Sequence, residues 1–148
     1  MKASNLDPVH ILIVDDDPAA VGLTKAALAT MGREKSLHVV RDGAQALDFV
    51  FRRGAYPDAP RPQLIVLDWN LPQRHGREVL TEIKESTKTR DIPVVVLSTS
   101  SADADVSDAY SRYANCYVAK AQDFDEFCEA LASVEKLWAD VVELPTPR

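Results

Sequence analysis

Five short apolar runs, spread along most of the chain, constrain its fold more than any other feature. They are rich in valine and isoleucine and do not alternate with polar residues, which is typical of strands buried on both faces of a sheet. Patterns with helical spacing separate them, so strand and helix are expected to alternate five times. This order predicts an α/β fold with a five-stranded parallel sheet between helices. The runs are HILIV (residues 10–14), LHVV (37–40), LIVL (64–67), IPVVVL (92–97) and CYVA (116–119).

Five helices are expected between and after these runs. The first begins with a favourable pair, Asp17 as N-cap and Pro18 as first helical residue. The segment 55–62 contains three prolines and predicts a surface loop before the third strand. The remaining helices are expected at residues 43–53, around Val79, Leu80 and Ile83, at about residues 102–113, and along the apolar stripe from Phe124 to Trp138.

Composition indicates one compact domain and excludes several classes of partner. The chain has 148 residues, 46% of them hydrophobic, and a net charge of −6. An acidic protein is a poor nonspecific ligand for nucleic acid or an anionic membrane. No apolar stretch approaches the roughly 20 residues of a membrane helix, and the N-terminus lacks the apolar core of a secretory signal. Cys116 and Cys128 show no metal-ligand spacing, so we interpret them as buried, reduced thiols of a cytoplasmic protein.

Polar side chains follow four of the five runs. In a parallel sheet these strand ends meet at one edge, where such folds bind ligands. Carboxylates held together there need a shared proton or a cation, and oxygen ligands without histidine or cysteine favour Mg²⁺. The residues are Asp15, Asp16 and Asp17 after the first run, Asp68 and Asn70 after the third, Ser98 and Thr99 after the fourth, and Lys120 after the fifth.

A lysine and a hydroxyl at the same edge suit a phosphoryl group, whose charge they would share with the metal. Asp68 follows a central run and is the candidate nucleophile for an acyl phosphate. Each residue alone has an ordinary interpretation as a helix cap, a turn residue or a surface charge. Their joint placement on four strand ends favours the functional interpretation.

Four motifs resemble the receiver domain of two-component response regulators over roughly residues 8–138. They are ILIVDDDP, LIVLDWNLP with Gly76 following, IPVVVLSTS, and CYVAK running into DFDEF. The resemblance implies a flavodoxin-like sheet in the order 2-1-3-4-5 with five flanking helices, and a histidine kinase as phosphoryl donor. It also implies a role for each site residue: Asp68 as phosphoacceptor, Asp15 and Asp16 as the acidic pocket, Asp16, Asp68 and the carbonyl of Asn70 as Mg²⁺ ligands, Ser98 as switch hydroxyl, Tyr117 as switch aromatic and Lys120 as phosphate contact.

A narrower resemblance concerns the segments GAYPDAPRPQLIVLDWNLP, ANCYVAK and LWADVVELP. They are similar to the stand-alone regulators that partner bacterial phytochrome histidine kinases, which implies a bacteriophytochrome partner. The family usually has proline after the conserved lysine, where this chain has Ala121. In the tail, residues 139–148, Val141, Val142 and Leu144 extend the last apolar stripe, and such clusters mark contact surfaces. We therefore expect a homodimer built on the C-terminal half.

Two alternative functions stay open. A phosphohydrolase with an aspartyl-phosphate intermediate would resemble a DxDx[TV] pattern, but Asp15 is followed by Asp16, Asp17 and Pro18. A phosphorylation-independent scaffold on the same fold would not need the complete set of acids, hydroxyl and lysine. In the favoured interpretation the protein catalyses only its own phosphorylation and dephosphorylation, and is not a conventional enzyme. His75 is interpreted as a loop histidine, not a phosphotransfer residue.

Overall fold

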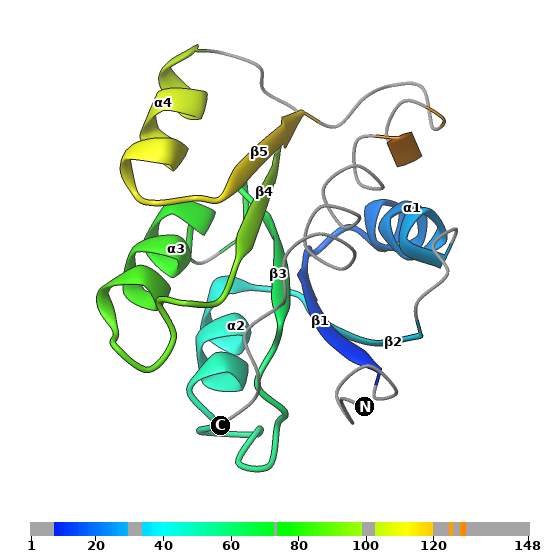
Figure 1. Ribbon diagram of the computed structural model, residues 1–148, viewed down its shortest axis with the longest axis vertical. Coiled ribbons are helices and arrows are strands. Elements are labelled where there is room, and N and C mark those ends of the chain that lie inside the picture. The colour runs from blue at the N-terminus through cyan, green and yellow to red at the C-terminus, as the bar shows by residue number, and fades with distance from the viewer. Residues whose placement is uncertain are drawn as a thin grey trace, which may run out of the picture.

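The computed structural model describes residues 8–29, 34–72, 74–98, 103–119, 125 and 128–129. Their five strands form one parallel sheet in the order β2-β1-β3-β4-β5, which confirms the expected fold and strand order (Figure 1). The strands are β1 (Val9–Val14), β2 (Lys35–Val40), β3 (Leu64–Asp68), β4 (Val94–Ser98) and β5 (Cys116–Ala119). The helices are α1 (Pro18–Ala29), α2 (Gly43–Val50), α3 (Gly76–Glu85) and α4 (Asp103–Ser111).

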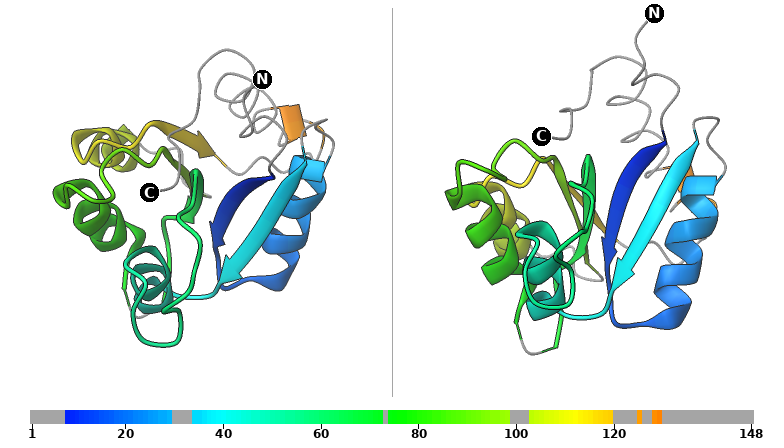
Figure 2. Two further views of the ribbon diagram at one scale, coloured as in Figure 1. Left: turned by 60° about the horizontal axis from the view of Figure 1, so that its bottom comes forward. Right: turned by 90° about the horizontal axis from the view of Figure 1, so that it is seen from below.

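The sheet separates two apolar cores, because alternate residues of a strand point to opposite faces. Helix α1 covers one face, and α2, α3 and α4 cover the other (Figure 2). On the α1 side Ile13 packs with Leu28, whereas its neighbour Leu12 packs with Leu47 and Leu80 on the other side. Strands β3 and β4 are buried throughout, as predicted, but the edge strands β2 and β5 are partly exposed.

The end of α2 and the start of β4 differ from the prediction for identifiable reasons. Helix α2 ends at Val50, not Arg53, because Arg52 has φ 55° and Gly54 has φ 61°, in the left-handed region that an α-helix excludes. The fourth strand begins at Val94, not Ile92, because Pro93 has no N–H to donate to the ladder.

The predicted surface loop before β3 is exposed only in its first part. Its last residues, Arg61 and Pro62, are buried, as is the following Gln63. The backbone N–H of Gln63 donates to the carbonyl of His10 at 2.8 Å, and the backbone N–H of His10 donates to Gln63 Oε1 at 3.2 Å. These bonds extend the pairing of β1 with β3 and draw the end of the loop against the sheet.

The C-terminal predictions lie mostly outside the described residues. Of the fifth predicted helix only Asp125, Cys128 and Glu129 are described, and all three are helical. Lys120, Ala121 and the tail 139–148 fall outside. Cys116 and Cys128 are free, as predicted, but only partly buried, and burial raises the pKa of the Cys116 thiol. Among the described residues no helix has the length and apolar character to cross a membrane.

Candidate functional site

Three of the predicted acids lie together where β1 and β3 end. Asp15 directly follows β1 and Asp68 is the last residue of β3. Because Val14 pairs with Leu67, the residues after each of them are neighbours. Ligand oxygens of Asp15, Asp16 and Asp68 all lie within 4.8 Å of one another. The side chains of Asp15 and Asp68 are buried, at 3% and 7% exposure, whereas Asp16 is exposed.

Local hydrogen bonds give the three consecutive acids different roles. The Asp15 N–H donates to the carbonyl of Val40 at 3.1 Å, and Asp15 Oδ1 accepts from the Asp17 N–H at 3.0 Å. Asp17 Oδ1 in turn accepts from the Ala19 N–H at 3.0 Å, in the first turn of α1. The ordinary interpretation, a helix cap, therefore holds for Asp17, while Asp15 and Asp16 lie with Asp68.

The backbone after β3 is held close to the sheet. The Trp69 N–H donates to the carbonyl of Leu97 at 2.9 Å, and the Gly76 N–H donates to the carbonyl of Trp69 at 2.9 Å. A Cβ on Gly76 would lie 2.6 Å from the backbone oxygen of Asp68, a distance that side chains do not tolerate. Asp68 Oδ1 also accepts from the Asn70 N–H at 3.3 Å. Only glycine at residue 76 lets the loop return this closely to Asp68.

Trp69 and His75, at the two ends of this loop, pack against each other. The Trp69 ring is 1% exposed, and His75 meets it edge-on with centroids 5.1 Å apart. His75 Nδ1 accepts from the Arg77 N–H at 3.0 Å, so His75 is the N-cap of α3. Burial, followed by the charge of Arg77, lowers the pKa of His75. These contacts agree with a structural histidine.

The two predicted switch residues lie on β4 and β5. Ser98 is the last residue of β4, is fully buried and pairs in register with Ala119. Tyr117 is partly buried against the core on the side of α2, α3 and α4. Its backbone N–H donates to the hydroxyl of Tyr110, on α4, at 3.2 Å. Sequence analysis missed Tyr110, because no local pattern marks a contact between a helix and the next strand.

The donor set fits a divalent cation. Asp15, Asp16 and Asp68 supply carboxylate oxygens alone, two of the three acids are buried, and hard ions such as Mg²⁺ prefer such ligands. A cavity of about 310 Å³ adjoins Asp15 and Asp16, and the basic residues Lys25 and Arg41 also line it. Among the described residues, the lining of this cavity thus carries two acids and two bases. The predicted phosphate contact Lys120 and the hydroxyl residue Thr99, which follows Ser98 in the sequence, lie outside the described residues.

The chain is similar to known response regulators. Response regulator Rcp1 of Synechocystis sp. is 40% identical over 145 residues, which cover 98% of this chain and 99% of that protein. The crystal structure of the phosphorylated cyanobacterial phytochrome response regulator RcpA has a TM-score of 0.89 at 37% identity, over 95% of this chain and 100% of that one. Mn²⁺-bound Rcp1 has a TM-score of 0.87 at 40% identity, over 94% and 100% of the two chains. The family model of the response regulator receiver domain matches residues 11–132, and the chain belongs to that family.

Proposed function

We propose that this protein is a single-domain response regulator, with residues 8–138 as the receiver domain, which accepts a phosphoryl group from a histidine kinase on Asp68. One observation carries the proposal. Oxygens of Asp15, Asp16 and Asp68 converge within 4.8 Å at the carboxyl edge of the sheet. Three acids in such proximity, two of them buried, suit a cation that can bring in an anionic reactant, and the central position of Asp68 suits an in-line nucleophile.

In the proposed reaction an oxygen of Asp68 attacks the phosphorus of a phosphohistidine. A P–O bond forms, the P–N bond breaks, and the imidazole leaves with the electron pair. Asp15, Asp16, Asp68 and the backbone carbonyl of Asn70 would hold Mg²⁺, which when bound neutralises charge on the transferring group. Lys120 would contribute its ammonium and Ser98 its hydroxyl to the phosphoryl oxygens.

The signal would then leave the site through β4 and β5. A phosphoryl group on Asp68 draws the Ser98 hydroxyl toward it, and Tyr117 turns into the space that Ser98 vacates. The hydrogen bond between the Tyr117 backbone and the Tyr110 hydroxyl, 3.2 Å long, ties this strand to α4. A local charge change thus alters the outer surface of α4 and β5, in the manner of other phosphorylation switches.

Phosphoryl labelling tests the central assignment. With acetyl phosphate or a phosphorylated kinase and Mg²⁺, the protein should gain one phosphoryl group that hydroxylamine removes, as it does from acyl phosphates. Asp68→Asn should abolish the label. Asp48→Asn is the matched control, since Asp48 is an acid on α2 that pairs with Arg53 instead. A label that survives in Asp68→Asn, or one located on His75, would contradict the proposal.

The proposed partner is a bacterial phytochrome histidine kinase. Support comes from RcpA, which is a phytochrome response regulator, and from the 37% identity it shares with this chain. A phosphorylated bacteriophytochrome from the same host should transfer its label to this protein within the time of a single kinase turnover. Transfer no faster than from unrelated kinases of the host would exclude the phytochrome as cognate partner.

The proposed assembly is a homodimer that uses the tail, residues 139–148. Its support is the run of apolar residues after Trp138, including Val141 and Val142. Sedimentation of the full chain should give a dimer at tens of micromolar, and a chain ending at Lys136 should give a monomer. A monomeric full chain, with and without phosphorylation, would refute the dimer.

A further inference from the structure

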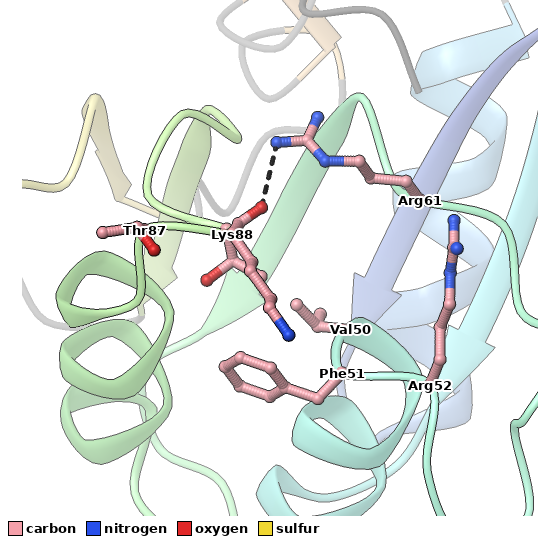
Figure 3. Close-up of a pocket in the computed structure, with 7 residues that line it drawn as sticks. Val50, Phe51, Arg52, Arg61, Thr87 and Lys88 are labelled. Carbon is pink, nitrogen blue, oxygen red and sulfur yellow. Dashed lines mark hydrogen bonds between the residues drawn. The ribbon is translucent and has the colours of Figure 1, made fainter. Parts of the chain in front are cut away.

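A second cavity lies at the edge of the sheet opposite to the acids. Its walls come from three segments: the end of α2, the loop before β3 and the loop after α3 (Figure 3). β3 and β4 begin beside it, so the length of β3 separates it from Asp68. Its volume is about 460 Å³. The lining residues are Val50, Phe51, Arg52, Arg61, Thr87, Lys88 and Thr89.

The cavity is strongly basic. Among the residues that the structure describes, the lining includes three cations, Arg52, Arg61 and Lys88, and no acid. Arg61 is only 8% exposed, and its Nη2 donates to the carbonyl of Lys88 at 3.4 Å, which joins two of the three segments (Figure 3). Arg52 and Lys88 are exposed. The exposed charges of Arg52 and Lys88 at the rim would attract an anion to this cavity.

The lining also contains an apolar part. Val50 is 7% exposed and Phe51 is partly buried, and the Lys88 side chain runs toward both of them (Figure 3). Arg52 has φ 55°, which is uncommon for a residue other than glycine, and this conformation ends α2 at the cavity. The exposed hydroxyl-bearing residue Thr87 completes the rim. A ligand that matches this lining has an anionic group and a carbon framework.

We propose that this cavity binds an organic phosphate of about mononucleotide size. Arginine donates in a fork that matches phosphate oxygens, and lysine adds a compact positive charge. The phosphate would lie among Arg52, Arg61 and Lys88, and the carbon framework would lie against Val50 and Phe51. A volume of about 460 Å³ is within the usual range for small-molecule sites. This site is distinct from the phosphoacceptor Asp68 and does not depend on it.

Calorimetric titration of the full chain with three probes tests the proposal. Adenosine 5′-monophosphate should bind saturably with a dissociation constant below about 1 mM. Adenosine lacks the phosphate and should bind at least about tenfold more weakly, because it loses the charge-assisted hydrogen bonds. Pyrophosphate lacks the carbon framework and should also bind more weakly than the monophosphate.

Variants locate the binding. The double variant R52Q/K88Q removes two exposed charges and should weaken monophosphate binding at least about tenfold. Arg53→Gln is the matched control, because Arg53 is adjacent and exposed but pairs with Asp48 and does not line the cavity. Its affinity should match the wild type. Thermal melts of all variants establish that the fold is intact.

Three results would overturn the proposal: adenosine or pyrophosphate binding as tightly as the monophosphate, R52Q/K88Q binding like the wild type, or no saturable binding up to about 10 mM. Each is separable from the function proposed for Asp68. Asp68→Asn should bind the monophosphate normally, and R52Q/K88Q should accept a phosphoryl group normally.

Discussion

Asp16 and Asp17 are adjacent acids with different expected roles, a metal ligand and a helix cap. Asp16 lies with Asp15 and Asp68, whereas Asp17 accepts the Ala19 N–H in the first turn of α1. Asp16→Ala should weaken Mg²⁺ binding about tenfold or more, because it removes a charged ligand. Without metal the variant should be slightly more stable, because like charges at ~4 Å repel by about 1 kcal/mol even in water.

Mg²⁺ binding is measured by a titration monitored through tryptophan fluorescence. The free energy of unfolding of the metal-free proteins is measured in a second experiment. Asp17→Asn is the matched control, since asparagine keeps the capping oxygen. An Asp16→Ala midpoint equal to that of the wild type would rule Asp16 out as a ligand.

His75 makes the start of α3 sensitive to pH. Its Nδ1 accepts from the Arg77 N–H, and a protonated ring cannot accept that bond. Burial, and then the charge of Arg77, lowers the pKa of His75 in the folded protein below the ordinary value of 6.5. Near pH 6 the unfolded chain therefore binds more protons at this residue than the folded protein does. The stabilisation is complete above the unfolded value of 6.5 and is lost as the pH falls through the lowered folded value.

Urea unfolding at several pH values between about 7.5 and 5 measures this effect. The free energy of unfolding of the wild type should fall more steeply with decreasing pH than that of His75→Asn, which caps but does not titrate. The pKa of His38 is also lowered, by burial and then by His10, but both proteins share that contribution. Parallel pH profiles would show that His75 does not contribute.

At the scale of the element, α4 depends on polar contacts with α3. Asp108 Oδ1 accepts from Arg112 Nε at 2.8 Å, and its Oδ2 lies 3.1 Å from Arg77 Nε. Arg112 Nη1 also donates to the Thr81 hydroxyl at 2.8 Å. On the described part of α4 only Ala109 is fully buried, so these bonds replace much of the missing apolar packing. The proposed signal passes through α4, which therefore needs a weak and reversible attachment.

Asp108→Asn should lower amide hydrogen-exchange protection in α4 by about 0.5–1 kcal/mol while leaving α2 unchanged. The loss should shrink in high salt, which screens such pairs. Glu82→Gln is the control, because its pair with Arg74, at 2.6 Å, is exposed and does not involve α4. Equal protection losses in α2 and α4 would contradict a specific attachment.

Element boundaries and loops were the hardest features to predict. The end of α2 depends on Arg52 in a left-handed conformation. The sequence gives no sign of this conformation, because glycine and not arginine is the residue that usually adopts it. The basic cavity was missed for a related reason. Arg52, Arg61 and Lys88 lie in three separate turns, and each alone has the ordinary interpretation of a surface charge. Only the folded loops place them around one space.

At the scale of the whole molecule, the apolar runs were sufficient to predict a parallel sheet but not the order of its strands. The runs at β1, β3 and β4 predicted buried strands, and these strands are buried along almost their whole length. Strand order came from the receiver resemblance, since periodicity does not say which strands are neighbours. The grouping of Asp15, Asp16 and Asp68 was predictable without side-chain detail, because the carboxyl ends of parallel strands meet at one edge of the sheet.

Lys84 connects three parts of the molecule that are distant in sequence. From α3, its Nζ donates to the carbonyls of Arg90 at 3.0 Å and Ile92 at 2.8 Å, and to Asn115 Oδ1 at 3.2 Å. Asn115 Oδ1 also accepts from the Val94 N–H at 2.9 Å. One ammonium thus joins α3 to the segments that precede β4 and β5. Burial lowers the pKa of Lys84 to about 8, so the ammonium with its three protons still dominates at pH 7.

Lys84→Met keeps the length of the side chain but leaves these acceptors without a donor. At pH 7 it should lower the free energy of unfolding by about 1–3 kcal/mol, less than the sum of three bonds, because the variant also avoids burying a charge. Lys88→Met is the control, since Lys88 is exposed and should change stability by less than about 0.5 kcal/mol. Hydrogen exchange should place the loss at the start of β4 and β5. A Lys84→Met protein as stable as Lys88→Met would show that the buried charge costs as much as its bonds contribute.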